Sequence, residues 1–463
     1  MENKKSQKGV NKGIMKRKIY QQLLDWKENR KGEVALLIEG ARRIGKSLIV
    51  EEFGRQEYDS YLLIDFNKAP QMVREWFDLY LEDLDTLFMF LSQHYQVKLH
   101  KRRSLIIFDE IQLCPRARAA IKFLVADGRY DYIETGSLMS IKKNTRGIVI
   151  PSEERSVKMY PMDFEEFLWA TGNEMLMDLI RKMYNENKPL GQILHRKAMD
   201  AFRLYMIVGG MPQAVKKYVE TQDFDEVDAI KRDILNIYRN DIFNYAAEQA
   251  DKVTNIVDQI PSQLSRHEKK FRITALAAGA KYRYWDDAFF WLRDARIINT
   301  CFNSTEPNIG VKLNEERTTF KCYLNDTGLL ISHTFDDKGI ASAQIYQKIL
   351  FDKLAVNEGM FIENIVAQML TASGHSLYFY GKASREAEHR MEIDFLIQKD
   401  KATSRHNIRP IEVKSGKNYT LSSLKKCMNK FGEYITLPTV LHDADYIEKD
   451  GITYLPLYMT PLL

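Results

Sequence analysis

The stretch Glu33–Val50, EVALLIEGARRIGKSLIV, decides the fold of this chain. Its apolar first part is short and has glycine on both sides, which is typical of a buried parallel strand. Gly40–Ser47 then follows the pattern G-x-x-x-x-G-K-[ST], and a helix is expected to continue from Ser47. Glycines at these positions let backbone N–H groups turn inward around an anion, at which the helix directs its positive end. The stretch therefore predicts a loop that holds the phosphates of a nucleotide.

The side chains of this loop predict how a nucleotide is held. Lys46 is expected to bridge the β- and γ-phosphates and to act in catalysis, and the Ser47 hydroxyl is expected to hold Mg²⁺. Nine residues are expected to bind the nucleotide: Gly40, Ala41, Arg42, Arg43, Ile44, Gly45, Lys46, Ser47 and Leu48. The alternative is an ordinary glycine-rich turn. However, an apolar strand before the loop and a helix after it are the context that a phosphate loop requires.

A second motif, Leu105–Glu110 (LIIFDE), places two acids after a buried strand. Four apolar residues carry Asp109 to the C-terminal end of that strand, where α/β sheets bind ligands. Asp109 is expected to ligate Mg²⁺ through water, and Glu110 is expected to polarise the attacking water. This assignment indicates a hydrolase rather than a nucleoside-monophosphate kinase. The alternative is a pair of capping acids at a strand end.

Three further residues are sensor candidates for the γ-phosphate. Thr135 and Ser137 follow the fourth predicted strand, Tyr130–Glu134, where a polar side chain can contact the phosphate or position water; an ordinary Thr-Gly-Ser turn is equally consistent. Arg155 is a candidate arginine finger that would stabilise the transition state in a neighbouring subunit. An arginine at the surface is the alternative for that residue.

Strands alternate with helices over the first third of the chain, which indicates a doubly wound α/β domain with a parallel sheet. The strands are expected at Glu33–Glu39, Tyr61–Phe66, Ser104–Asp109 and Tyr130–Glu134, and the helices at Met15–Asn29, Ser47–Gly54, Pro70–Tyr95 and Arg116–Asp127. This domain is expected over residues 15–160, after a disordered basic tail at 1–14.

The rest of the chain predicts three more segments. Residues 161–250 have a helical period that is interrupted by a turn at Gly209–Pro212. Residues 251–335 have the order of a winged helix-turn-helix, with helices at Val253–Leu264, Ile273–Ala280 and Tyr284–Ala295 before strands at Ile297–Asn303 and Phe320–Asn325. Residues 336–463 begin with a helix and continue with alternating strands, which predicts a second α/β domain.

Composition constrains the partners only weakly. The net charge of the 463 residues is +5, but residues 1–18 hold seven Lys or Arg and one acid, so the remainder is close to neutral at about −1. The global charge is therefore weak support for a nucleic-acid partner. Because no run of ~18 apolar residues occurs and no apolar stretch follows the first charges, neither a membrane span nor a secretory signal is expected. The scattered cysteines suit a reducing compartment, and a cytoplasmic location is expected.

Five motifs in a fixed order resemble one protein family. They are GARRIGKS, LIIFDEIQ with Gln112, YIETGSL, YPMDFEEFL at residues 160–168 and VGGMPQAV at residues 208–215. Together they resemble bacterial and archaeal AAA-type ATPases with a winged-helix segment and a C-terminal restriction-endonuclease-like domain of unsettled function. The resemblance covers roughly residues 15–440. It implies adenine specificity and a nucleotide site formed by Lys46, Ser47, Asp109 and Glu110.

The C-terminal domain contains a candidate nuclease set. Asp394 and Glu412 lie on two predicted strands, where they can share a Mg²⁺ ion, and Lys414 lies beside them to activate water. Glu363, on the preceding helix, would complete the set. The spacing is similar to the PD-(D/E)XK pattern of nucleases, although Met391-Glu392-Ile393 replaces the proline of that pattern. The alternative is a non-cutting domain of the same fold that keeps these residues as buried ion pairs or binds DNA or protein.

The winged segment is consistent with DNA contact but also with packing between two other domains. Three arginines are expected on the exposed side of a recognition helix, namely Arg283, Arg293 and Arg296. The apolar side of that helix would carry Trp285, Phe289 and Leu292. A basic turn lies next to it in the sequence and consists of Arg266, His267, Lys269, Lys270 and Arg272.

Three functional hypotheses follow from the sequence. The first is an ATP-binding and ATP-hydrolysing switch or motor that controls the C-terminal domain on DNA. The second is a nuclease that the ATPase licenses. The third is a nucleotide-binding signalling or defence scaffold that recruits a protein partner without nuclease activity. The expected cofactors are ATP and Mg²⁺, and the expected partners are DNA and further copies of the chain, with no membrane.

Overall fold

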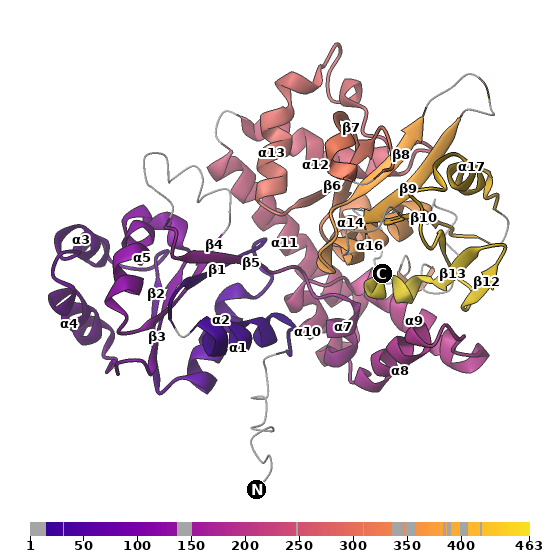
Figure 1. Cartoon of the computed structure of the whole chain (residues 1–463). Coiled ribbons are helices and arrows are strands. Elements are labelled where there is room, and N and C mark those ends of the chain that lie inside the picture. The colour runs from indigo at the N-terminus through magenta and orange to yellow at the C-terminus, as the bar shows by residue number, and fades with distance from the viewer. Residues whose placement is uncertain are drawn as a thin grey trace, which may run out of the picture. The chain divides into compact units, whose positions relative to one another are not determined.

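Five parallel strands form the sheet of the first unit, Met1–Tyr160, in a computed structural model of the chain (Figure 1). Their order is β2-β3-β4-β1-β5, with β1 Ala35–Glu39, β2 Ser60–Asp65, β3 Ser104–Asp109, β4 Asp131–Gly136 and β5 Glu154–Lys158. The structure describes residues 15–30, 32–136, 151–246, 249–308, 310–335, 344, 346–348, 358–382, 386, 390–398, 406–416 and 419–463. The predicted α/β fold with a parallel sheet is confirmed.

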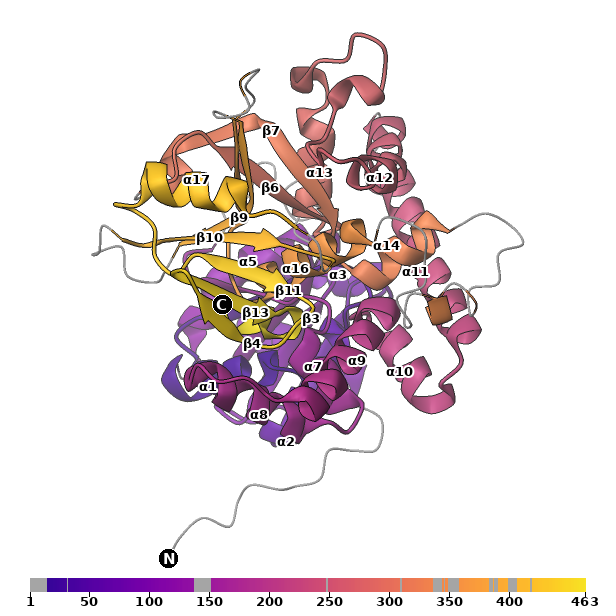
Figure 2. The same cartoon turned by 90° about the vertical axis from the view of Figure 1, so that its right-hand side faces the viewer.

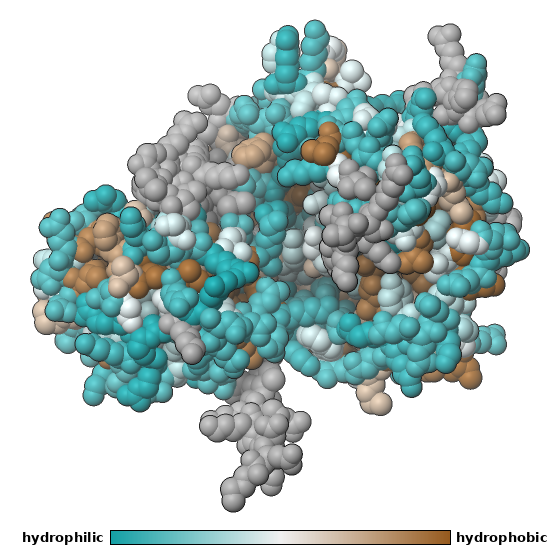
Figure 3. Space-filling model, in the orientation of Figure 1, coloured by the Kyte–Doolittle hydropathy of each residue, from teal (hydrophilic) through white to brown (hydrophobic). Residues whose placement is uncertain are grey.

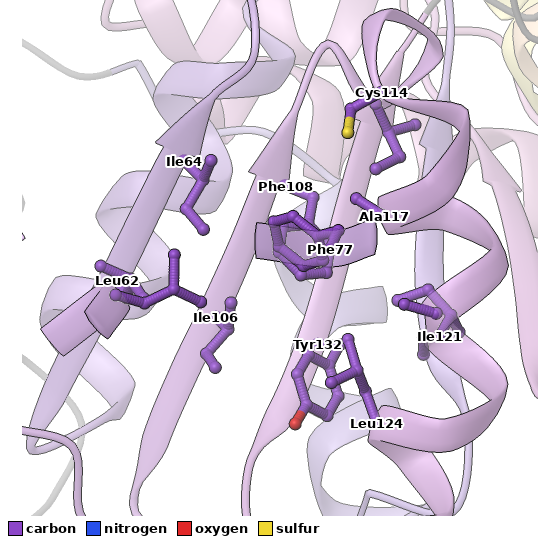
Figure 4. Close-up of a cluster of buried hydrophobic side chains, with 14 of the residues drawn as sticks. Leu62, Ile64, Phe77, Ile106, Phe108, Cys114, Ala117, Ile121, Leu124 and Tyr132 are labelled. Atoms are coloured by element: carbon purple, nitrogen blue, oxygen red, sulfur yellow. The ribbon is translucent and has the colours of Figure 1, made fainter. Parts of the chain in front are cut away.

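Helices cover both faces of this sheet. They are α1 Ile19–Arg30, α2 Lys46–Glu57, α3 Gln71–Leu79, α4 Leu84–Tyr95 and α5 Pro115–Asp127. Side chains alternate between the faces of a strand, so Ile106 and Phe108 pack with α3, α4 and α5 in the cluster of Figure 4. Leu105 points the other way, toward Gly54 of α2. The sheet is therefore buried on both sides, which explains why every residue of β1 and β3 is buried and why most of them are apolar.

One predicted helix of this unit is wrong. The stretch Pro70–Tyr95 forms two helices, because the Asp83 side chain accepts a hydrogen bond of 3.2 Å from the Thr86 N–H and caps a new helix. The fifth strand, β5, was not predicted because its residues ERSVK are polar and largely exposed at the edge of the sheet.

Helices also dominate the first half of the second unit, Pro161–Leu463. Among the described residues, the α-helices of this unit are α7 Phe164–Ala170, α8 Glu174–Asn185, α9 Gln192–Val208, α10 Pro212–Thr221, α11 Phe224–Tyr245, α12 Ala250–Leu264, α13 Asp286–Asp294, α14 Thr327–Thr334, α16 Gly359–Ala372 and α17 Ser422–Phe431. The predicted turn at Gly209–Pro212 separates α9 from α10. The segments predicted over 161–250, 251–335 and 336–463 all lie in this one unit.

An eight-stranded mixed sheet spans the second half of this unit (Figure 2). Its order is β12-β13-β11-β10-β9-β8-β6-β7, with β6 Ile298–Ser304, β7 Glu315–Leu324, β8 Tyr378–Lys382, β9 Met391–Gln398, β10 Ile408–Val413, β11 Thr439–His442, β12 Ile447–Lys449 and β13 Ile452–Pro456. The β6–β7 hairpin, which was expected to be the wing of a separate domain, pairs in parallel with β8 through Phe302 and Asn303. The hairpin is therefore one edge of the C-terminal sheet.

Two of the three helices expected before this hairpin are present, as α12 and α13, but the middle one is not. Only a single 3₁₀ turn, Ile273–Ala275, occupies the start of the expected helix Ile273–Ala280. Gly279 has φ +69°, a left-handed conformation that ends a right-handed helix. The winged helix-turn-helix is therefore not confirmed.

The surface in Figure 3 is mostly hydrophilic, and brown apolar atoms gather over the part of the first unit that holds α3 and α4. Exposed apolar side chains of these two helices include Met72, Leu79 and Met89. Within the described ranges, no helix combines the length and the apolar character that a membrane crossing requires.

Candidate functional site

The phosphate loop of the first unit has the backbone that its glycines predict. Gly40 follows β1, and a Cβ there would come within 2.4 Å of the Met159 carbonyl oxygen, so only glycine fits beside the end of β5. Gly45 has φ +92° and Arg43 has φ +66°. Left-handed residues within a turn direct successive N–H groups to one side, which makes a concave site for an anion.

Lys46 lies at the centre of this loop. Its side chain is buried, and its Nζ donates hydrogen bonds to the carbonyl oxygens of Gly40 at 3.0 Å and Ala41 at 2.9 Å. Burial lowers the pKa of Lys46, while the nearby charges of Glu110 and Asp109 oppose this shift. The loop thus holds an ammonium group beside both acids, at the position where phosphate oxygens can replace the two carbonyls as its partners.

Ser47 and Asp109 meet, although they come from different elements. The Ser47 hydroxyl at the start of α2 donates to Asp109 Oδ1 at 2.8 Å, and Asp109 ends β3. The Thr135 hydroxyl on β4 also donates to Asp109 Oδ1. Burial raises the pKa of Asp109, and these two hydrogen bonds act against that rise. A hydroxyl and a carboxylate are the oxygen ligands that Mg²⁺ takes beside phosphates, so these residues fit the ion.

The position of Thr135 therefore has a structural explanation that the sequence did not supply. Thr135 is fully buried and orients the carboxylate of Asp109, whether or not it also contacts a phosphate. Ser137, the second sensor candidate, lies outside the described residues. Arg155, the third, is exposed on β5, an edge strand of the sheet, and its role as an arginine finger remains a prediction.

Glu110 follows Asp109 in a strained backbone conformation. It has φ +54°, which is uncommon for a residue with a side chain and is frequent at functional sites. The amide Nε2 of buried Gln112 donates to Glu110 Oε2. The turn after β3 thus holds Glu110 near Lys46, and the buried amide of Gln112 fixes the direction of the Glu110 carboxylate. Gln112 is therefore a positioning residue for Glu110.

We expect Gln112→Leu to lower kcat for ATP hydrolysis about tenfold or more and to leave the affinity for ATP unchanged. A hydrogen bond to a charged group contributes about 1.5–3 kcal/mol, and about 1.4 kcal/mol corresponds to a tenfold change in rate. Steady-state kinetics and nucleotide titration separate the two effects. Gln93→Leu, at an exposed position of α4, is the matched control. A loss of ATP affinity equal to the loss of kcat would instead indicate general damage to the site.

Sequence reasoning missed Arg17, which it treated as part of the basic N-terminal charge. Arg17 is buried, and its guanidinium donates to the Ile44 carbonyl in the phosphate loop and to the Tyr160 carbonyl, each at 2.7 Å. It therefore ties the loop to the last residue of the first unit. Nothing in the run of lysines and arginines around it distinguishes this residue.

The four candidate nuclease residues of the second unit lie in one cluster. Glu363 is on α16, Asp394 on β9, Glu412 on β10, and Lys414 follows that strand. Lys414 forms an ion pair with Glu412, and Asp394 Oδ2 accepts a hydrogen bond of 2.9 Å from the Val413 N–H. Burial raises the pKa of Glu412 to about 7.

Two further lysines, which sequence reasoning did not connect with this cluster, lie within it. Lys321 on β7 is buried, and its Nζ is 3.1 Å from Glu363 Oε1 and 3.4 Å from Asp394 Oδ1. Lys269 forms an ion pair with the other oxygen of Glu363. Burial by itself raises the pKa of Glu363, but these two ammonium groups outweigh burial and hold it at about 2. A lysine inside the buried strand FKCYL was a usable signal, because a buried ammonium group requires a partner.

The arginines predicted on a recognition helix are placed differently. Arg283 is exposed as predicted, in the 3₁₀ turn Tyr282–Tyr284 before α13, whereas Arg293 in α13 and Arg296 after it are half-buried. Within α13 the exposed residues are Asp286, Asp287 and Phe290. Arg293 lies over the Phe302 ring, and Lys269 of the basic turn faces Glu363. Exposed acids at the start of α13 repel DNA phosphates, so this helix does not present the predicted basic face.

Comparisons with known proteins match three parts of the chain. Residues 33–168 match the model of an AAA domain family, and residues 199–338 and 358–459 match two domains of unknown function, DUF8612 and DUF4143. An uncharacterized protein of Haemophilus influenzae is 24% identical over 192 residues, which are 39% of this chain. That match spans 44% of the length of the relative.

Solved structures that match this chain do so with TM-scores under 0.5. A Walker-type ATPase of Pyrococcus abyssi has a TM-score of 0.41 at 15% identity and covers 70% of this chain and 97% of that one. The ORC2 protein of Aeropyrum pernix in its ADP form has a TM-score of 0.27 at 12% identity and covers 73% and 93%. The RuvB Holliday junction branch migration motor of Thermotoga maritima has a TM-score of 0.27 at 12% identity and covers 61% and 89%. The match over residues 33–168 supports an AAA-type P-loop ATPase domain in this part of the chain.

Proposed function

We propose that this chain binds ATP with Mg²⁺ at the loop Gly40–Leu48, hydrolyses it, and uses the nucleotide cycle to switch the state of its second unit. The observation that carries the proposal is the contact of 2.8 Å between Ser47 and Asp109, beside the buried ammonium of Lys46. A hydroxyl, a carboxylate and an ammonium group from two motifs far apart in the sequence thus converge on one site. The preference for ATP over GTP is inferred from the similarity to AAA domains.

Each residue of this site has a separate task in the proposed reaction. The backbone of the loop and Lys46 bind and orient the phosphates. Ser47 and Asp109 would hold Mg²⁺, which would neutralise part of the negative charge of the phosphates. Thr135 keeps the carboxylate of Asp109 in position. Glu110, directed by Gln112, accepts a proton from the attacking water and aligns it with the terminal phosphate. Arg155 of a neighbouring copy is a candidate for stabilising the transition state, which requires a homo-oligomer.

Binding of ATP to the purified full chain tests the first step. We expect Mg²⁺-dependent binding, and Lys46→Ala is expected to weaken it about tenfold or more, because this residue makes charged hydrogen bonds to the phosphates. Titration with a fluorescent ATP analogue, with and without EDTA, measures both effects. Lys98→Ala, at an exposed lysine of the same unit outside the loop, is the control. Equal binding by Lys46→Ala and the parent chain would refute the assignment of this site.

We propose that the nucleotide cycle changes which partner the second unit binds. DNA is one candidate partner, and a protein recruited by a nucleotide-bound scaffold is the other. The lysine-filled acid cluster and the exposed acids of α13 favour a protein partner over cleavage of DNA. An electrophoretic mobility assay with single-stranded and duplex DNA, with ATP and without nucleotide, discriminates between the two candidates. DNA binding that depends on ATP would support the first.

A further inference from the structure

We infer that the acid cluster of the second unit has a built-in cation, the ammonium group of Lys321, at the place where a nuclease of this type would bind a divalent metal ion. The cluster then acts as a metal-independent joint between β7 and the C-terminal strands. This inference goes beyond the proposed ATPase function and does not depend on it, because all the residues concerned lie within Pro161–Leu463.

The position of Lys321 carries the inference. Its Nζ is 3.1 Å from Glu363 Oε1, 3.3 Å from Glu392 Oε1 and 3.4 Å from Asp394 Oδ1. The side chain is only 1% exposed. One ammonium group therefore has three carboxylates around it, which is the arrangement that would otherwise attract a divalent cation.

Most of the other carboxylate oxygens of the cluster also have partners in the protein, whereas Glu412 Oε1 is buried without a hydrogen-bond partner. Glu363 Oε2 pairs with Lys269, and the Tyr323 hydroxyl donates to Glu363 Oε1 at 2.5 Å. Glu412 Oε2 pairs with Lys414, and Lys270 lies 4.0 Å from Glu392. The formal charges balance, since four acids face four lysines, namely Glu363, Glu392, Asp394 and Glu412 against Lys269, Lys270, Lys321 and Lys414.

A balanced cluster of this kind is a poor metal site. Mg²⁺ binds oxygen ligands at about 2.0–2.1 Å and carries two positive charges, so its entry would place it against the Lys321 ammonium. Burial lowers the pKa of Lys321, but the three carboxylates outweigh this and raise it well above its usual value, so the group stays charged. In the part of the chain that the structure describes, no group of three or more His, Cys, Asp or Glu side chains is arranged to hold a metal ion.

The sources of the charges explain what the cluster does instead. Lys269, Lys270 and Lys321 come from the segment 251–335, whereas Glu363, Glu392, Asp394 and Glu412 come from the segment after residue 358. Removing one partner of a buried ion pair costs about 3–5 kcal/mol, because the other charge is left unpaired. The cluster therefore fixes the β6–β7 edge to the rest of the sheet, with a lysine in the role that a metal ion has in a metal-bridged domain.

The test measures Mn²⁺ alone on the full chain without nucleotide, by the electron paramagnetic resonance of free Mn²⁺. The parent chain and Asp394→Asn are expected to bind the same amount of Mn²⁺, since the cluster of the parent chain takes none. Lys321→Ala leaves the acids in excess and is expected to gain one bound Mn²⁺ ion per chain. The double variant Lys321→Ala with Asp394→Asn is expected to lose that ion again. Lys382→Ala, an exposed lysine on β8, is the matched control and should gain none.

Two results would overturn the inference. The first is Mn²⁺ binding by the parent chain that Asp394→Asn removes, and the second is a folded Lys321→Ala variant that gains no ion. Should Lys321→Ala fail to fold, the comparison of the parent chain with Asp394→Asn still decides the question. Plasmid cleavage in Mg²⁺ or Mn²⁺ gives an independent measurement. We expect no cleavage by the parent chain above that of Asp394→Asn, and a clear difference between them would contradict a metal-free cluster.

Discussion

Glu110→Gln is expected to reduce the rate of ATP hydrolysis by about 10²–10⁴-fold, the usual contribution of a general base. The glutamine keeps the size of the side chain but cannot accept the proton of the attacking water. Binding of ATP with Mg²⁺ should be retained, because Lys46, Ser47 and Asp109 keep their contacts. Release of inorganic phosphate gives the rate, and titration with ATP gives the affinity.

Glu82→Gln is the matched control for this experiment, since Glu82 is an exposed glutamate of the same unit in the turn before α4. It should hydrolyse ATP at the parent rate. A Glu110→Gln variant with unchanged hydrolysis would remove Glu110 from the mechanism. If the parent chain itself binds ATP with negligible turnover, and Glu110→Gln changes nothing, the scaffold hypothesis is favoured over the switch.

The geometry of the candidate nucleotide site was predictable from the sequence because the patterns that define it are local. The loop Gly40–Ser47 and the strand that ends at Asp109 each have a pattern that fixes both the secondary structure and the ends of the element. Parallel strands place their C-terminal ends at one edge of a sheet, so two local patterns sufficed to predict that Ser47 and Asp109 lie together. The structure has them 2.8 Å apart.

The acid cluster was only half predictable because its other half is non-local. The pattern of residues 297–325 predicts a hairpin, and the hairpin is present. That pattern does not say which strand lies next to the hairpin in the sheet. The neighbouring strand is β8, which starts only at Tyr378. Lys321 was therefore assigned to a separate wing, away from Glu363. The role of Arg17 was missed for a related reason. Its guanidinium donates to the backbone carbonyl groups of Ile44 and Tyr160, and every residue type has such a group, so the sequence does not indicate the contact.

The motif VGGMPQAV requires glycine at position 210 because two backbone segments of the second unit lie in close contact there. Gly210→Ala is expected to break this contact. The Gly210 carbonyl accepts a hydrogen bond of 2.6 Å from the Met162 N–H, and the Gly210 N–H donates to Asp326 Oδ2 at 2.6 Å. A Cβ on Gly210 would lie 2.1 Å from the Met162 carbonyl oxygen, a group that cannot rotate away. The Tyr205 hydroxyl donates to this same oxygen at 2.9 Å. The substitution must therefore displace two backbone segments and disturb a buried polar network.

We expect Gly210→Ala to lower the free energy of unfolding of the second unit by about 3 kcal/mol, which combines overpacking of about 1–3 kcal/mol with a strained or lost buried hydrogen bond of about 1–3 kcal/mol. Urea denaturation followed by tryptophan fluorescence measures the change, and ATP binding by the first unit should persist. Gly416→Ala is the matched control, because a Cβ at Gly416 meets nothing within 4 Å, and its effect should stay within about 0.5 kcal/mol. Equal stability of the two variants would show that Gly210 is not held against Met162. The close approach of these two backbone segments would then not be what requires glycine in this motif.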